Sequence, residues 1–385
     1  MRETFDRPHE WESSNRPLTR REFGRIAMLL TAGASLPFYN ESALAQDLKT
    51  LASIPSDAVR LHTNENPMGP CPAALEAIRQ IIPQGGRYLF EQTHAFVEAM
   101  AAVEGLPSPH ILPSAGSSDP LHRTVLAFTS PSRSLVIAEP GYEAPERAAR
   151  FVGAKVVQIP LRKDYSHDTQ AMAKADPNAG MIYVCNPNNP TGTVTRKDDI
   201  AALVANKPKD CVVVIDEAYL HFATTASPAT ELVAAGKDVI ILRTFSKLYG
   251  MAGLRAGAAL GRPDLLEKLR GYGGLAILPV TGTAGATASL KEKGLVPERR
   301  KIVADIREEL FAWLDKKRYA FIPSEANMVL IDGKRPGREV ATAMLQHKIA
   351  IGRSWPSLPQ HVRVTIGARE EMAKFRTAFE RVMET

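Results

Sequence analysis

Short apolar runs alternate with amphipathic stretches through the middle of the chain, from about Leu112 to Leu260. The runs are rich in β-branched residues and apolar throughout, a pattern typical of parallel strands that are buried on both faces. Strands are predicted at residues 135–138, 155–159, 181–185, 211–215, 239–244 and 256–260. The pattern therefore predicts an α/β fold with a mostly parallel sheet that helices cover on both faces.

The pattern changes after about residue 280. Long charged helices are predicted at residues 297–317 and 369–383, beside short strands at 328–331 and 362–366. These elements indicate a smaller α+β domain. We therefore expect four parts: a leader over residues 1–45, an N-terminal segment over 46–75, a large domain over 76–280 and a small domain over 281–385.

The composition is typical of a soluble globular protein, with 44% hydrophobic and 23% charged residues. The formal net charge of +6 could indicate nucleic acid or an anionic surface as a partner. The Lys and Arg residues are scattered, however, and form no basic stripe interleaved with aromatic residues. We therefore expect anionic small substrates and no nucleic acid. Cys71, Cys185 and Cys211 lack the spacing of a metal site and are expected in the core.

Residues 1–45 have the order of an export signal. The pair Arg20-Arg21 is followed by an apolar run over residues 26–38 and by Ala43-Leu44-Ala45 before Gln46. The arginine pair indicates the twin-arginine (Tat) machinery, which would carry the folded protein to the periplasm. The apolar run is shorter than the roughly 20 residues of a membrane-spanning helix, so no stable membrane anchor is expected. The alternative is a chance arginine pair before a buried helix.

Three residues with related chemistry follow predicted strands, directly or within a few positions: Asn189, Asp216 and Lys247. A lysine amine can bond covalently to an aldehyde cofactor, and a carboxylate can keep the ring nitrogen of such a cofactor protonated. Because ligands bind at the carboxyl ends of parallel strands, we expect these side chains to lie in one site.

A second motif, Ser114-Ala-Gly116-Ser117-Ser118-Asp-Pro120, is typical of a helix start. Pro120 is suited to the first turn of a helix that runs to about residue 128, with Ser118 near its cap. A helix start presents free N–H groups and a positive dipole end, which would bind a phosphate.

Together these motifs resemble the class I/II aminotransferases of fold type I, and most closely the histidinol-phosphate aminotransferase branch. The resemblance runs from about Leu61 to the C-terminus. It implies pyridoxal 5'-phosphate (PLP) as cofactor, an amino acid or related amine as donor, a 2-oxo acid as acceptor, and a homodimer. A decarboxylase or lyase on the same scaffold, or a PLP-binding protein without catalysis, would carry the same cofactor motifs.

The resemblance also implies the role of each cofactor-binding residue. Lys247 would hold PLP and move the proton, Asp216 would pair with the ring nitrogen, and Tyr219 and Asn189 would hydrogen-bond the phenolic oxygen. Tyr142 would stack on the ring, although Gly141 replaces the residue that usually precedes this tyrosine. The phosphate would be held by Gly116, Ser117, Ser118, Thr244, Ser246 and Arg255.

Substrate contacts are implied in the small domain and in the N-terminal segment, which would cross the mouth of the site. They are Asn66, Asn327, Arg353 and Arg363. Tyr88 matches a tyrosine that reaches the phosphate in the partner subunit, but Leu89 and Phe90 depart from the residues that usually follow it. Histidinol phosphate is a cytoplasmic intermediate, so export argues against it as the substrate.

Overall fold

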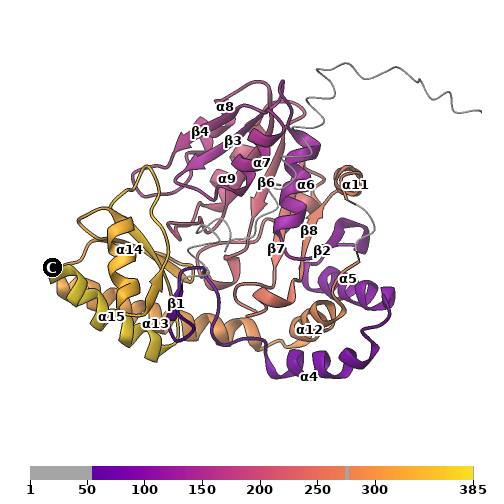
Figure 1. Ribbon diagram of the computed structural model, residues 1–385. Coiled ribbons are helices and arrows are strands. Elements are labelled where there is room, and N and C mark those ends of the chain that lie inside the picture. The colour runs from indigo at the N-terminus through magenta and orange to yellow at the C-terminus, as the bar shows by residue number, and fades with distance from the viewer. Residues whose placement is uncertain (1–53, 274–276, 385) are drawn as a thin grey trace, which may run out of the picture. The chain divides into compact units, whose positions relative to one another are not determined.

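The structure is a computed structural model that describes residues 54–273 and 277–384 (Figure 1). Its central sheet has seven strands in the order β2-β8-β7-β6-β5-β3-β4. Strand β8 is antiparallel to both of its neighbours, and all other adjacent pairs are parallel. The strands are β2 (Ile111–Ser114), β3 (Ser134–Glu139), β4 (Val156–Pro160), β5 (Ala179–Cys185), β6 (Val212–Asp216), β7 (Val239–Thr244) and β8 (Gly257–Gly261).

The mostly parallel sheet is confirmed, and every predicted strand of this region is present to within two residues. Strand β2 was not among the predicted strands. It has only four residues, and one of them is Pro113, a residue type that is rare inside strands. It pairs with β8, so that Ser114, the first residue of the predicted phosphate-binding motif, lies opposite Gly257.

Residues of the central strands alternate between two apolar clusters, one on each face of the sheet. In β6, Val212 and Val214 belong to one cluster, whereas Val213 and Ile215 belong to the other. The first face is covered by α6 (Ser118–Phe128), α7 (Ala144–Phe151) and α11 (Pro263–Arg270). The second is covered by α5 (Phe90–Glu104), α8 (Thr169–Lys174), α9 (Lys197–Asn206), α10 (Thr230–Ala234) and α12 (Val280–Lys291). Burial on both faces explains the uninterrupted apolar runs.

The C-terminal part contains an antiparallel sheet in the order β12-β10-β9. Its strands are β9 (Phe321–Ile322), β10 (Met328–Asp332) and β12 (His361–Thr365). The helices are α13 (Leu295–Lys317), α14 (Gly337–Gln346) and α15 (Arg369–Glu384). In α15 the buried residues recur at helical spacing, as in Met372, Phe375 and Phe379, and they pack in the same cluster as Leu310 and Leu314 of α13. The two long helices predicted here are therefore confirmed.

Strand β1 (Val59–Leu61) pairs in parallel with β11 (Ile349–Ile351). Figure 1 labels β1 close to α13 and α15. The N-terminal segment therefore lies against the C-terminal part of the chain. Helix α4 (Pro72–Ile81) packs on α12, which also contacts α5. The division into domains near residue 280 stays a prediction. Among the described residues there are also four short 3₁₀ turns: η2 (Ile82–Gln84), η3 (Ser108–His110), η4 (Leu220–Phe222) and η5 (Ala252–Leu254).

The predicted export signal over residues 1–45 lies outside the described residues and stays a prediction. Within the described part of the chain, no helix is both long and apolar enough to cross a membrane. Cys71, Cys185 and Cys211 are buried, as expected of core residues. Burial raises the pKa of the Cys211 thiol to about 12, so this thiol stays protonated at neutral pH.

Candidate active site

A cavity of about 250 Å³ lies where the carboxyl ends of β5, β6 and β7 meet. Most of the predicted cofactor residues line it, although they come from well-separated parts of the chain. They are Ser117, Ser118, Tyr142, Asn189, Asp216, Tyr219, Thr244, Ser246, Lys247 and Arg255. The structure therefore brings together residues that end or follow β3, β5, β6 and β7, residues at the start of α6, and Arg255 from the turn before β8.

Lys247 follows β7 and is only 8% exposed. Its Nζ atom donates a hydrogen bond of 3.1 Å to the carbonyl oxygen of Thr63, and it lies 5.5 Å from the centroid of the Tyr219 ring. Thr63 was not predicted as a site residue. It comes from the N-terminal segment, whose approach to the lysine depends on the pairing of β1 with β11.

Asp216 is the last residue of β6 and is buried. Its carboxylate accepts hydrogen bonds from the hydroxyl of Tyr183 at 2.8 Å and from the backbone N–H of Ala218 at 3.1 Å. Burial and the charge of Asp216 raise the pKa of Tyr183 well above its ordinary value. Tyr183 therefore remains a hydrogen-bond donor, and both contacts stabilise the negative charge of Asp216.

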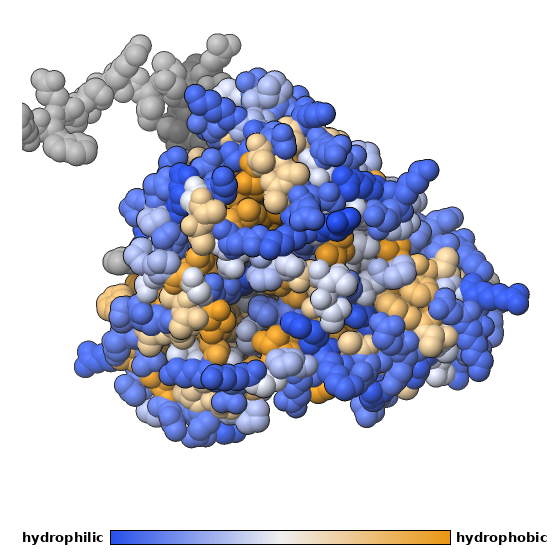
Figure 2. All heavy atoms as spheres, turned by 180° about the vertical axis from the view of Figure 1, so that it is seen from behind, coloured by the Kyte–Doolittle hydropathy of each residue, from blue (hydrophilic) through white to orange (hydrophobic). Residues whose placement is uncertain are grey.

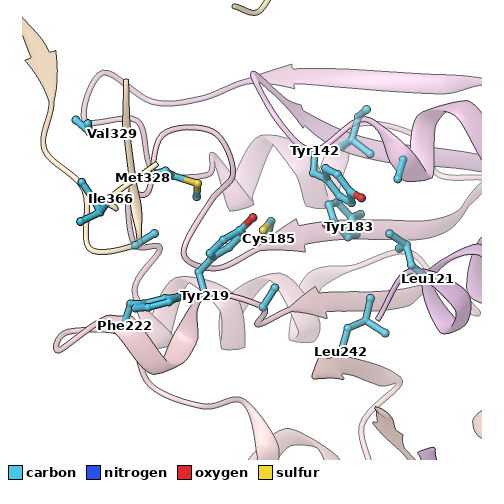
Figure 3. Packing of buried hydrophobic residues seen from close by; sticks show 14 of the residues in the cluster. Leu121, Tyr142, Tyr183, Cys185, Tyr219, Phe222, Leu242, Met328, Val329 and Ile366 are labelled. Atoms are coloured by element: carbon cyan, nitrogen blue, oxygen red, sulfur yellow. The ribbon is translucent and has the colours of Figure 1, made fainter. Parts of the chain in front are cut away.

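Tyr183 was missed by the sequence analysis. It lies on β5, two residues before Cys185, which pairs with Asp216 across the two parallel strands. Figure 3 shows its side chain in the same cluster as Tyr142 and Tyr219. A tyrosine within an otherwise aliphatic strand was the available signal, because a buried hydroxyl needs a polar partner.

The N-terminal segment makes a second unpredicted contact, through Asn64. Its side-chain amide donates to the hydroxyl of Tyr219 at 3.0 Å, and its backbone N–H donates to Oγ1 of Thr365 at 2.9 Å. Asn64 has a φ of 55°, a left-handed conformation that asparagine tolerates better than most residues. The amide of Asn327 donates to the Asn64 carbonyl oxygen at 3.1 Å. Asn327 thereby supports the segment that contacts Tyr219.

The predicted phosphate corner combines a helix start, hydroxyl groups and a guanidinium. Ser117 occupies the cap position of α6. Arg255 donates to Oγ of Ser246 at 3.2 Å, and Oγ1 of Thr244 donates to the same oxygen at 3.0 Å. At Gly116 a Cβ atom would lie 2.3 Å from Nη2 of Arg255 and would displace this side chain, and the φ of +89° also favours glycine. These groups suit a phosphate, with Asp216 and Lys247 lining the same cavity, so the residues fit PLP.

The predicted substrate residues do not themselves line the cavity, but two of them contact residues that do. Arg363 is fully buried and donates to Oδ1 of Asn189 and to the carbonyl oxygen of His62, each at 2.8 Å. Asn327 also donates to the carbonyl oxygen of Glu65 at 3.4 Å. Asn66 instead donates to the carbonyl oxygen of Leu248 at 2.8 Å.

Arg353 forms an ion pair with Glu143, the residue after Tyr142, and its guanidinium carbon lies 4.3 Å from the centroid of the Trp355 ring. The same loop explains the glycine before Tyr142. A Cβ atom at Gly141 would lie 2.5 Å from the carbonyl oxygen of Ala138, and the Gly141 carbonyl accepts a 2.9 Å hydrogen bond from Nε1 of Trp355.

Tyr88 lies away from the cavity and is 65% exposed. It immediately precedes Leu89, the cap residue of α5, and its ring centroid is 5.9 Å from that of Phe90, which is also exposed. Its predicted reach into a partner subunit stays a prediction.

The comparisons with known proteins agree with this geometry. The family model for aminotransferase class I and II matches residues 56–382. The histidinol-phosphate aminotransferase of Symbiobacterium thermophilum is 35% identical over 84% of this chain and 90% of the relative. The aromatic amino acid aminotransferase of Cutibacterium acnes is 31% identical over 87% of this chain and 93% of the relative. The crystal structure of histidinol-phosphate aminotransferase from Sinorhizobium meliloti in complex with PLP has a TM-score of 0.78 and 26% identity, covering 85% and 91% of the two chains.

Replacing Gly116 with Ala should weaken PLP binding by roughly tenfold or more, because the added methyl group would displace Arg255 from the phosphate corner. Fluorescence titration of the apoprotein with PLP measures this. Gly236→Ala is the matched control, because Gly236 has a similar φ of +68° and open space around its Cβ position. Equal affinities in the two variants would exclude the proposed cradle.

Proposed function

This chain belongs to the aminotransferase class I and II family and is a PLP-dependent aminotransferase, and we propose that Lys247 is its catalytic lysine. The observation that carries this assignment is the meeting of Lys247, Asp216, Tyr219 and Arg255 in one cavity. A surface lysine would be exposed to solvent, whereas Lys247 is buried beside the aromatic ring of Tyr219.

Bound PLP supplies an aldehyde that takes up the amino group and a ring that withdraws electrons from the α-carbon of the substrate. We assign to Asp216 the contact with the ring nitrogen, because its charge is stabilised by Tyr183 and by the Ala218 N–H. Tyr219 and Asn189 would orient the cofactor through its phenolic oxygen. Nζ of Lys247 would hold the cofactor and, as a free amine, would take the proton from the substrate α-carbon.

The remaining residues bind the two ends of the reactants. Arg255, with the hydroxyls of Thr244 and Ser246 and the start of α6, would hold the cofactor phosphate. Arg363 would bind the carboxylate of the amino donor or 2-oxo acid, because a guanidinium provides paired donors in one plane. Its contact with Asn189 places it next to the cavity wall. Among the named relatives, one group acts on histidinol phosphate and another on aromatic amino acids.

Lys247→Ala should remove the visible absorbance of the lysine-bound cofactor and lower turnover by roughly 1,000-fold or more. Spectra and steady-state rates with a panel of amino acids measure both effects. Lys237→Ala, at an exposed lysine, is the control and should behave as the parent. Full activity in Lys247→Ala would move the catalytic lysine elsewhere.

We also propose that the enzyme is a homodimer whose interface includes Tyr88 and Phe90. Both aromatic side chains are more than half exposed, as is Ile82 at the end of α4. Figure 2 shows apolar residues gathered in patches on one face of the molecule. Adjacent exposed aromatic residues are typical of protein interfaces, and Tyr88 would extend from this surface toward the partner's cofactor phosphate.

Phe90→Glu should weaken the dimer by roughly 30-fold or more, because it places a charge in the apolar interface. Sedimentation velocity across a dilution series measures the shift from dimer to monomer. Phe151→Glu introduces the same charge at another exposed phenylalanine, on α7, and should remain dimeric. A parent protein that is an active monomer would contradict the proposal.

We further propose that the Tat machinery exports the enzyme to the periplasm as a folded, PLP-loaded protein. Two features support this proposal: the arginine pair in the leader, and a cofactor site whose residues range from Gly116 to Arg255. An unfolded chain cannot form such a site, so PLP binds only after folding. A route that carries folded proteins allows PLP to bind before export.

Replacing Arg20 and Arg21 together with Lys should leave active PLP-loaded enzyme in the cytoplasm. Cell fractionation followed by N-terminal sequencing tests this, and the periplasmic parent should begin near Gln46. Finding the parent wholly cytoplasmic with residues 1–45 intact would refute the export proposal and favour a cytoplasmic role in the histidine pathway.

A further inference from the structure

We propose that Glu143 sets the substrate class of this enzyme by neutralising Arg353. The site would then accept α-amino carboxylates and discriminate against amines that carry a phosphate monoester. The inference rests on the proposed function, because it assumes that the cavity binds an amino donor.

The ion pair joins two segments that flank the cavity. Glu143 follows Tyr142, which lines the cavity, and it occupies the cap position of α7. Arg353 lies two residues beyond the end of β11. The side chains of this pair are 20% and 23% exposed for Arg353 and Glu143 respectively. Partial burial makes the pairing stronger than it would be between fully exposed side chains.

Arg353 and Arg363 are neighbours through Trp355. Their guanidinium carbons lie 4.3 Å and 5.5 Å from the centroid of the same buried indole ring. Arg363 in turn contacts Asn189 in the cavity wall. The two arginines are therefore adjacent cations next to the cavity wall, and we take them as the charge partners that a strongly anionic substrate group would use.

The loop that carries Arg353 is held against the loop that carries Tyr142. Nε1 of Trp355 donates to the carbonyl oxygen of Gly141 at 2.9 Å, and Oγ of Ser357 donates to a carboxylate oxygen of Glu139 at 2.7 Å. These contacts keep Glu143 opposite Arg353. A phosphate that recruited Arg353 would have to displace Glu143 or lie beside its negative charge.

The charge balance on this side of the cavity favours a singly charged group. Arg255 is assigned to the cofactor phosphate, and the charge of Arg353 is offset by Glu143. Glu65 adds a carboxylate to the cavity lining. Arg363 is then matched to a carboxylate of charge −1, whereas a phosphate monoester carries a charge close to −2 at neutral pH. Repulsion between a carboxylate of the protein and a doubly charged phosphate of the substrate is a common way to exclude one substrate in favour of another.

L-histidine and L-histidinol phosphate are suitable probes, because they share the imidazole side chain and differ in the anionic group. For each, kcat/KM is measured with PLP-loaded parent enzyme; a compound that is not converted is instead ranked by its inhibition constant against a converted amino acid. The parent should favour L-histidine by roughly tenfold or more. Glu143→Gln should move the ratio toward histidinol phosphate by roughly tenfold or more, because it frees Arg353 while keeping the side-chain shape.

Three variants identify the cause of such a shift. Glu143→Asp retains the charge and should keep the parent preference. Glu146→Gln removes a carboxylate from the same helix that pairs with Arg150 instead, and should also keep it. Adding Arg353→Gln to Glu143→Gln should cancel the gain. If Glu143 only supported the packing around Tyr142, Glu143→Gln would lower both rates and leave their ratio unchanged, which would contradict its role in substrate choice.

A parent enzyme that prefers histidinol phosphate, or a Glu143→Gln variant with an unchanged ratio, would overturn the role of Glu143. The proposed function is tested separately by the spectral change of bound PLP on mixing with L-amino acids. Conversion of the cofactor with an unchanged ratio contradicts only the inference about Glu143. A parent whose cofactor no amine converts contradicts the proposed site as well.

Discussion

Two consecutive buried carboxylates at the end of β6 impose the main constraint on this structure. Asp216 is turned toward the cavity, where Tyr183 contacts it, whereas Glu217 forms an ion pair with Arg243. Arg243 also binds Glu104 of α5 through two hydrogen bonds, of 2.8 and 2.9 Å. Buried charges are costly unless they are paired, so β5, β7 and α5 must all be in place before β6 can end with two acids.

This ion network also positions the residues that follow it. Arg243 is next to Thr244 in the phosphate corner, and Lys247 lies a few residues further along. The carboxylate of Glu104 lowers the electrostatic cost of burying Arg243. Burial raises the pKa of Glu104, but the charge and hydrogen bonds of Arg243 outweigh this effect and hold the pKa below its ordinary value. The proposed cofactor residues thus follow strands that are held in place by charge pairing on the other face of the sheet.

The sequence was sufficient to predict features that depend on local pattern, and insufficient for those that depend on packing between distant segments. The apolar runs predicted the strands because both faces of the sheet are buried, and the strand ends predicted that Asp216 and Lys247 would meet. The contacts of Tyr183 and Asn64 could not be located, because they depend on strand register and on the pairing of β1 with β11. Likewise, no local pattern distinguishes the Glu143–Arg353 pair from surface charges.

The pairing of β1 with β11 has a consequence for the synthesis of the protein. Thr63 and Asn64 emerge from the ribosome early, but Thr365, which holds Asn64, is among the last residues to be translated. A nascent chain can form the central sheet while translation continues. The contacts of Thr63 and Asn64 beside Lys247 and Tyr219 form only after the final segment has been synthesised. Completion of the site is therefore a post-translational event, and until then Asn64 lacks the Thr365 contact that holds it.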